Sequence, residues 1–286
     1  MQLASGEARP ALRILCATDF SLASLQAFHH ALGMALTRPS ALTLLHVGPE
    51  SRDAVPWDRF PSVHDTLVRW GRLAADSPRT AVEEELGITV RKFAMRDEDP
   101  GMGILDHLAQ HPADLIVMAT RPSVGLARLT HRWVTAQVLR TARCNMLLLP
   151  NDCRSLLDEA SGAPRLRRLL LPLDHEPDPR DTIALVTDWL LPWCPERLQA
   201  TTLHVGSGTA PECVLPRPQD IAWERRQLKG PVAPTILAQA QELDVDLVVM
   251  PTAAHNGWLQ RLRDSTVERT LRWVGRPLLA IPDSGP

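Results

Sequence analysis

The sequence predicts an α/β protein built from two copies of one domain, each with a parallel sheet. Apolar strand-like segments alternate with segments of helical periodicity, which is typical of parallel strands joined by crossover helices. In addition, residues 114–120 (Asp-Leu-Ile-Val-Met-Ala-Thr) return almost unchanged as residues 246–252 (Asp-Leu-Val-Val-Met-Pro-Thr). A repeat period of this length indicates two duplicated domains and not a solenoid of small units.

The offset between the copies changes along the chain. Position 114 matches position 246, an offset of 132 residues, whereas His46 matches His204, an offset of 158 residues. The second copy therefore lacks 26 residues from its middle. We expect it to have lost about one helix and part of a strand, which leaves a proline-bearing loop over residues 206–229 with a short strand near residues 227–228.

The elements of the first copy follow from apolar runs and their flanking residues. An apolar run ended by Asp19 has the pattern of a buried strand. Ser21 can cap the helix that follows, and Asp99-Pro100 opens another helix because proline suits a first turn. The predicted strands are residues 12–18, 42–47, 88–93, 115–118 and 145–149. The predicted helices are the one after Ser21, one over about 63–85 with an interruption near 77–78, and those over 100–111 and 133–141.

The second copy repeats this order. The predicted strands are residues 168–173, 199–205, 246–250 and 277–281, and the predicted helices are residues 180–191, 231–243 and 264–273. Continuous apolar strands indicate sheets covered on both faces. We therefore expect one domain over residues 10–150, a linker over 151–165, and a shortened second domain over 166–283.

Composition excludes several classes of function. The net charge of −2 over 286 residues gives no electrostatic reason to expect nucleic acid or an anionic membrane as a partner. No apolar run approaches the roughly 20 residues that span a bilayer, and the N-terminal residues lack the pattern of a signal peptide. The five cysteines form no C-x-x-C pair, so reduced thiols and a cytoplasmic location are expected.

Several motifs together resemble the universal stress protein family. They are Ala17-Thr-Asp-Phe-Ser21, Leu44-Leu-His-Val47, residues 114–120, Gly125-Leu-x-Arg128-Leu129 and the closing residues 146–150. The resemblance covers residues 12–150 and about 166–282. It implies two flavodoxin-like domains of the Rossmann-like, adenine-nucleotide alpha-hydrolase-like type, each a five-stranded parallel sheet between helices. It also implies that the final strands, 145–149 and 277–281, pair antiparallel, so that one tandem chain imitates a dimer of single domains.

Nucleotide-binding members of that family carry the signature G-x2-G-x9-G-[ST] after the fourth strand. There, small residues let backbone amides surround a triphosphate. This chain places Ala119, Pro122, Arg132 and Trp133 at those positions in the first half, and Pro251, Ala254, Asp264 and Ser265 in the second. Ser265 alone fits. The prolines have no N–H to donate, Trp133 fills space, and Asp264 would repel a phosphate, whereas Arg132 could contact one.

The resemblance nevertheless defines a set of candidate nucleotide-binding residues. Asp19 and Asp174 match the family position that contacts the nucleoside, although we favour a helix-capping or turn role for them. The full set is Asp19, Val47, Ala119, Thr120, Gly125, Arg132, Asp174, Val205 and Ser265. No cofactor is expected, and the alternative is ATP or AMP with magnesium.

Histidines offer other chemistry. We expect His46 and His204, at strand ends, to be packed and hydrogen-bonded. His107 and His111 lie four apart on a helix, a spacing that can hold zinc, but the sequence shows no third ligand, and we interpret them as a solvated helix face. Residues 174–176 (Asp-His-Glu) are expected to be a polar loop. No nucleophile–base pair, P-loop or other catalytic motif is found.

The sequence therefore favours a tandem universal stress protein with degenerate nucleotide sites and a regulatory or interaction role in the cytoplasmic stress response. The alternative is an ATP- or AMP-binding stress sensor that uses the first half. A third hypothesis is a nucleotide-dependent transferase or ligase, which the missing phosphate motif argues against. The expected partners are the two domains themselves as a pseudo-dimer, a second copy in a homodimer, and an unidentified regulatory protein.

Overall fold

The computed structural model describes residues 10–49, 54–120, 134–151, 153–194, 196–217, 219–252 and 275–282. The strands of the first half are β1 (Leu12–Ala17), β2 (Ser40–Gly48), β3 (Ile88–Arg96), β4 (Leu115–Thr120) and β5 (Asn145–Pro150). Its helices are α1 (Leu22–Ala35), α2 (Val63–Arg69), α3 (Ala81–Glu84), α4 (Pro100–Gln110) and α5 (Val134–Thr141), with a short 3-10 turn η2 (Trp57–Arg59).

The second half repeats the strand order. Its strands are β6 (Arg168–Pro172), β7 (Leu198–Val205), β8 (Ile221–Leu228), β9 (Leu247–Thr252) and β10 (Leu278–Pro282). Its helices are α6 (Pro179–Leu185), continued by a π-helical turn η4 (Val186–Leu190) and a 3-10 turn η5 (Leu191–Trp193), and α7 (Val232–Glu242). The helix expected over 264–273 lies outside the described residues.

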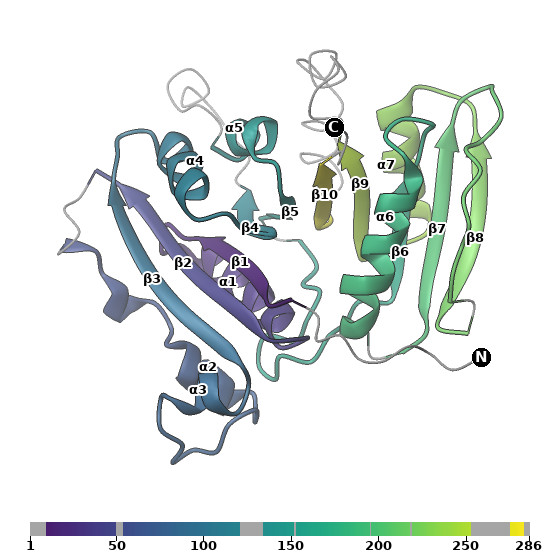
Figure 1. Ribbon diagram of the computed structural model, residues 1–286. Helices are drawn as coiled ribbons and strands as arrows, with labels where there is room; N and C mark the ends of the chain where they lie inside the picture. The colour runs from purple at the N-terminus through teal and green to yellow at the C-terminus, as the bar shows by residue number, and fades with distance from the viewer. Residues whose placement is uncertain are drawn as a thin grey trace.

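The described strands form one continuous sheet in the order β3-β2-β1-β4-β5-β10-β9-β6-β7-β8. Within each half the neighbouring strands are parallel. The halves join where β5 and β10 pair antiparallel, through Leu148 with Leu278, Leu147 with Leu279 and Met146 with Ala280. Figure 1 shows the two halves on either side of this seam. The prediction that the final strands join the halves antiparallel is confirmed.

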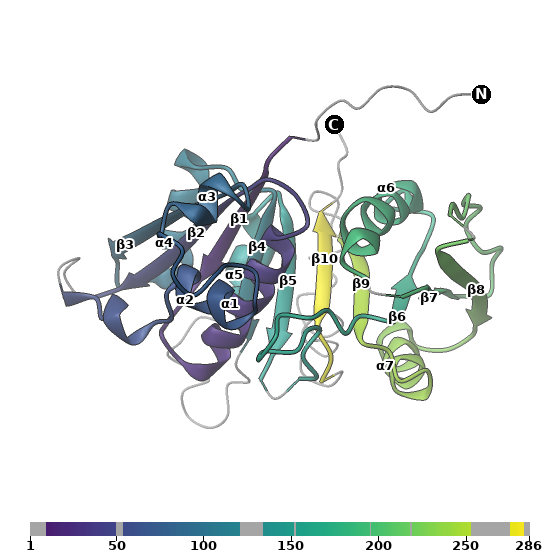
Figure 2. The same ribbon diagram turned by 90° about the horizontal axis from the view of Figure 1, so that it is seen from below.

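Helices cover both faces of this sheet, and each face has its own apolar core. One core places residues of α1, α2, α6 and η4 against the sheet, for example Phe28 and Val186. The opposite core places residues of α4, α5 and α7 against it, for example Ile104, Val138 and Ile236. Figure 2 shows α6 and α7 on opposite faces of the second half. This layering explains why the central strands are apolar on both sides.

Caps explain where the helices begin. The side chain of Ser21 accepts a hydrogen bond from the Ser24 N–H, and the side chain of Asp99 accepts from Gly101 and Met102. Both predicted helix starts are therefore confirmed. The helix expected over 63–85, with an interruption near 77–78, is wrong in extent, because α2 ends at Arg69 and α3 covers four residues only. Gly71 follows α2 with a φ of 66°, a conformation that ends a helix.

The second half differs as the change of offset predicts. Between β7 and β8 the described residues contain no helix, so the predicted loss of a helix is confirmed within the part of the chain that the structure describes, and the loop ends where β8 begins at Ile221. The expected loss of part of a strand is wrong, since β8 is eight residues long and pairs with β7 along its whole length. The indole of Trp223, on β8, donates to the Pro216 carbonyl at 2.8 Å and so ties the loop to the strand.

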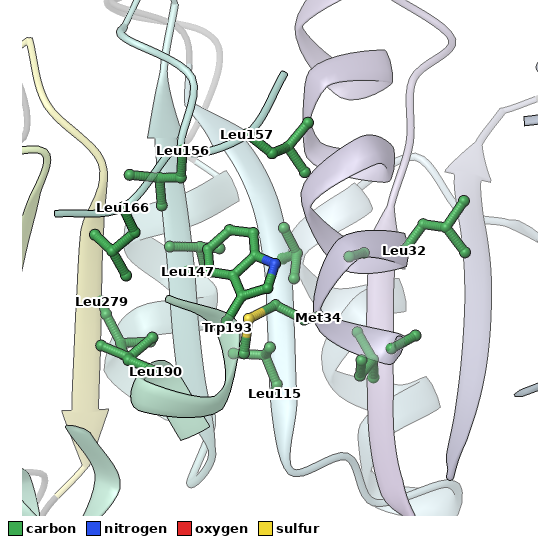
Figure 3. Close-up of a cluster of buried hydrophobic side chains, with 14 of the residues drawn as sticks. Leu32, Met34, Leu115, Leu147, Leu156, Leu157, Leu166, Leu190, Trp193 and Leu279 are labelled. Carbon is green, nitrogen blue, oxygen red and sulfur yellow. The ribbon is translucent and has the colours of Figure 1, made fainter. Parts of the chain in front are cut away.

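Residues 151–165, which we call the connector, pack tightly onto the first half. Leu156 and Leu157 are buried beside α1, and Figure 3 shows them with Trp193 in the core between the halves. The indole N–H of Trp70 donates to the Glu159 carbonyl at 2.9 Å. A cavity of about 10 Å³ lies in this core, beside Met34 and Trp189. It is too small for any ligand larger than one water molecule.

We expect the connector to tolerate no side chain at Gly162. This residue has a φ of 66°, and a Cβ on it would lie 2.3 Å from the Trp70 ring. Gly162→Ala should cost about 2–4 kcal/mol of stability, from the left-handed backbone and the overpacked ring together. Gly71 has the same φ and open space around it. Gly71→Ala should therefore cost only the backbone part, about 1–2 kcal/mol. Urea unfolding of the two variants tests this, and equal losses would contradict it.

A repeated carboxylate fixes the opposite, amino-terminal edge of each half. Asp114 accepts the Arg13 backbone N–H at 2.9 Å, and its side chain pairs with the Arg13 guanidinium. Its counterpart Asp246 accepts the backbone N–H groups of Arg167 and Arg168, each at 2.9 Å. Both carboxylates thus anchor the first strand of their half beside the fourth. This role explains why an aspartate opens each of the two matching segments 114–120 and 246–252.

Candidate functional site at the carboxyl edge of the sheet

The strand order places a topological switch point between β1 and β4 in the first half, and between β6 and β9 in the second. Ligands of open α/β sheets bind at such points, beyond the carboxyl ends of the strands. Six of the predicted site residues are described and lie at this edge: Asp19, Val47, Ala119 and Thr120 in the first half, and Asp174 and Val205 in the second. The other three, Gly125, Arg132 and Ser265, lie outside the described residues.

Asp19 has a clear local role. Its carboxylate accepts hydrogen bonds from the Ser21 backbone N–H, at 3.1 Å, and from the Ser21 hydroxyl. Ser21 in turn caps α1. The carboxylate therefore holds an Asx turn that sets the start of the helix. Because Asp19 is exposed, its carboxylate also faces the space beyond β1.

Phe20 stands between Asp19 and Ser21 with a φ of 60°, a left-handed conformation that is uncommon for an aromatic residue. Its ring packs edge-on against Trp57, at a centroid distance of 5.3 Å, and against Phe60, at 5.7 Å. It also lies 4.7 Å from the His46 ring. We call these four residues the aromatic cluster. It closes the carboxyl edge of β1 and β2 on the face covered by α1.

His46 and His204 perform the same task in the two halves. The Nδ1 of His46 donates to the carbonyl of Thr18, just past β1, at 2.8 Å. The Nδ1 of His204 is 3.3 Å from the carbonyl of Leu173, just past β6. Each ring therefore contacts the first carbonyl beyond the first strand of its half. The prediction of packed, hydrogen-bonded histidines is confirmed.

Asp174 lies in an exposed turn after β6. Its Oδ1 accepts the His175 backbone N–H at 2.8 Å and is 3.8 Å from Nδ1 of His204. The imidazole Nε2 of His175 donates to the Thr209 carbonyl at 2.8 Å. The polar loop predicted at residues 174–176 is thus tied to the loop that replaces the missing helix.

Val47 and Val205 contribute backbone groups, and not side chains, to the carboxyl edge of the sheet. Leu45 accepts a hydrogen bond from the Thr18 N–H, on the β1 side, and Gly48 accepts one from Asp97, on the β3 side. Since bonding residues alternate along a parallel strand, Val47 directs its N–H and C=O toward the β1 side, past its end. Leu203 and Gly206 bracket Val205 in the same way.

The ends of β4 and β9 complete the edge. Thr120 is buried, and its carbonyl accepts the Asn151 N–H at 3.1 Å. Ala119 is partly buried against the core. Pro251, within β9, is paired with Ile281 of β10 and is buried. As a proline it offers no amide to a phosphate at this position.

The interpretation of residues 107 and 111 as a solvated helix face is wrong for His107. This side chain is buried against the Phe93 ring, at a centroid distance of 4.8 Å, and burial lowers its pKa. His111 is exposed at the end of the helix and lies 4.8 Å from His107. Among the described residues, no group of three or more metal-ligating side chains is placed to hold a metal ion.

Sequence reasoning did not find the aromatic cluster. Its members come from the turn after β1, from β2 and from an aperiodic stretch between β2 and α2, so no periodicity links them. The available signals were Phe20 between two turn-forming polar residues and the proximity of Trp57 and Phe60 in a proline-rich stretch.

The fold and its edge define a class of protein: a tandem of Rossmann-like α/β domains joined into one sheet. The family model of the universal stress proteins matches residues 11–150 and 168–282. The chain therefore belongs to the universal stress protein family. A comparison with curated protein sequences finds no significant match. In the residues described, no helix has the length and apolarity needed to cross a membrane.

Solved structures share the whole two-domain arrangement. A universal stress protein from Archaeoglobus fulgidus DSM 4304 is similar over 95% of this chain and 96% of its own, with a TM-score of 0.63 and 16% identity. A functionally unknown protein from Pseudomonas aeruginosa PAO1 is similar over 96% and 93%, with a TM-score of 0.58 and 15% identity. A protein from Pseudomonas aeruginosa UCBPP-PA14, described as a universal stress protein, matches over 95% and 93%, with a TM-score of 0.57 and 17% identity. At identities this low, the three structures show the fold of this chain and nothing further.

Proposed function

We propose that this tandem universal stress protein has a non-enzymatic, regulatory role in the cytoplasmic stress response, exerted through a protein partner, and that neither half holds ATP tightly. The observation that carries the proposal is that the edge side chains serve the protein's own fold. Asp19 holds the turn before α1, the aromatic cluster closes the edge beside it, and His46 donates to the Thr18 carbonyl just past β1.

Electrostatics and hydrogen-bond donors support the same conclusion. A triphosphate needs amides, cations or magnesium to match its charge. Pro122 and Pro251 each remove an amide from their signature, and Asp264 adds a negative charge to the second. Each lost charge-assisted hydrogen bond costs about 1.5–3 kcal/mol. Two defects therefore weaken binding by roughly a hundredfold or more, and the second half should be the poorer site.

A second candidate function, an ATP- or AMP-binding stress sensor that uses the first half, is favoured by one feature. Val47 directs its backbone N–H and C=O beyond the end of β1, and Asp19 is exposed beside it. Arg132 would add a cation to that half, with magnesium as the accompanying ion.

Calorimetric titration with ATP and magnesium tests the proposal. We expect no binding of micromolar affinity. A variant that carries Pro122→Gly, Arg132→Gly and Trp133→Ser restores three of the four signature positions of the first half, leaving Ala119, and should regain measurable heat. Micromolar binding by the natural chain would overturn the proposal.

A matched pair of variants would then identify the site. Asp19→Asn keeps an acceptor for the turn before α1, because the asparagine oxygen can also accept from Ser21. Asp19→Ala removes it. A nucleoside contact predicts weaker binding in both variants, whereas a turn role predicts lower stability in the alanine variant alone. Capture of a specific protein from stressed cells by the natural chain tests the regulatory part.

A further inference from the structure

Two neighbouring histidines of α1 lie where the connector packs onto the first half. His29 and His30 are 4% and 0% exposed, so both rings are buried. They have no part in the proposed function. Their hydrogen bonds fix the protonation state of each ring.

His30 must be neutral for the connector to bind as it does. Its Nδ1 is 2.7 Å from the Gln26 carbonyl, and a carbonyl can only accept, so Nδ1 carries the hydrogen. The backbone N–H of Leu156, in the connector, donates to Nε2 at 3.0 Å. Nε2 therefore presents its lone pair. The Ser155 hydroxyl lies 3.5 Å from Nε2, and the ring lies 6.3 Å from that of Trp193.

His29 is held in the same form by a different partner. The Arg69 guanidinium, at the end of α2, lies 3.2 Å from Nε2, and a guanidinium can only donate. The hydrogen is therefore on Nδ1, which is buried and has no hydrogen-bond partner among the described residues. Glu159 of the connector is nearest, with Oε2 at 3.8 Å from Nδ1. This separation is too long for a hydrogen bond.

The charges around the pair come from three elements. Arg69 on α2 opposes protonation of His29, and Glu159, which is half-exposed, favours it. A charge on His29 would oppose protonation of His30, and Asp158 of the connector is paired with Arg165. Burial, assisted by these neighbouring charges, lowers the pKa of each ring from 6.5 to about 4. Both rings are therefore neutral while the connector is packed on α1.

We propose that His29 and His30 form an acid-sensitive clasp, which releases the connector from α1 when the protein is acidified. A proton on Nε2 of His30 would point an N–H at the Leu156 N–H, so the hydrogen bond is lost and a charge is left in an apolar site. A proton on Nε2 of His29 would likewise point an N–H at the Arg69 guanidinium, so that hydrogen bond is lost too. Opening lets both rings reach water and bind protons.

The direction and range of the effect follow from the two pKa values. Above pH 6.5 neither the open nor the closed state binds these protons, so the clasp is closed. Between pH 6.5 and about 4 the open state binds protons that the closed state excludes. The opening equilibrium therefore rises about tenfold per pH unit for each histidine. Asp244 pairs with Arg154 of the connector. Its arginine partners lower its pKa to about 2, so this ion pair stays charged throughout the same pH range.

Hydrogen exchange at the Leu156 amide tests the clasp directly. Protection factors, corrected for the intrinsic pH dependence of exchange, should fall at least about tenfold between about pH 6.5 and about pH 5 in the natural chain. His30→Gln retains an acceptor near the Nε2 position and cannot be protonated, so its fall should be smaller by about tenfold per pH unit. His111→Gln, a change at an exposed histidine away from the connector, should behave as the natural chain does.

A constant protection factor in the natural chain, or an equal fall in His30→Gln, would overturn the proposal. Should His30→Gln fail to fold, a proton NMR titration of the natural chain supplies the second measurement. The His30 ring signal should then shift in step with the loss of Leu156 protection. A ring that becomes protonated while Leu156 stays protected would contradict the clasp.

Discussion

Leu148→Lys is expected to abolish the cooperative unfolding of the two halves. Leu148 is 0% exposed and pairs with Leu278 across the antiparallel seam. A lysine there would bury an unpaired ammonium, which costs several kcal/mol. A typical domain has only about 5–15 kcal/mol of total stability. The variant should therefore unfold in two separate transitions or fail to fold at all.

Urea unfolding followed by far-ultraviolet circular dichroism measures this effect. Leu148→Met is the matched control, since a swap that keeps the volume in an apolar core costs less than about 1.5 kcal/mol. The control should keep one transition near that of the natural chain. A lysine variant with an unchanged urea midpoint and unchanged cooperativity would show that the seam does not hold the halves together.

Asp246→Ala should cause the second large loss of stability. Asp246 is 5% exposed and accepts two backbone N–H groups, those of Arg167 and Arg168. It also pairs with Arg154 of the connector, at 3.2 Å. Each donor left without a partner costs about 1–3 kcal/mol, so the loss of both bonds should cost about 2–6 kcal/mol.

Its counterpart in the first half provides an internal comparison. Asp114 accepts one backbone N–H, that of Arg13, and its side chain is 31% exposed. Asp114→Ala should therefore cost less than Asp246→Ala. Urea unfolding at pH 7 ranks the two variants. Equal losses, or the reverse order, would contradict the explanation from orphaned backbone donors.

The large-scale architecture was predictable because duplication leaves a strong signal. Two offsets located the missing segment, matching apolar strands predicted both halves, and the resemblance to the universal stress proteins predicted the seam. The end of the helix expected over 63–85 was not predictable. The apolar residues of this segment follow helical spacing, but the Trp70 indole bonds to the connector and Gly71, with its positive φ, ends α2. Such tertiary contacts override local periodicity.

The candidate site was predictable only in its position. The order of elements placed Asp19, Val47 and Asp174 at one edge, as the fold requires. What the sequence could not show is which side chains of the same domain pack and hydrogen-bond at this edge. The contact of Phe20 with Trp57 and the bond from His46 to Thr18 join segments far apart in the chain. Their geometry depends on the folded sheet.

The nucleotide content of the purified protein tests the central claim most directly. The chain is expressed in cells that contain ATP and AMP, purified without added nucleotide, denatured, and its supernatant separated by chromatography. The account predicts far less than one adenine nucleotide per chain, because neither half retains the donors that a triphosphate needs. One nucleotide or more per chain would contradict it and would establish the first half as a working nucleotide site.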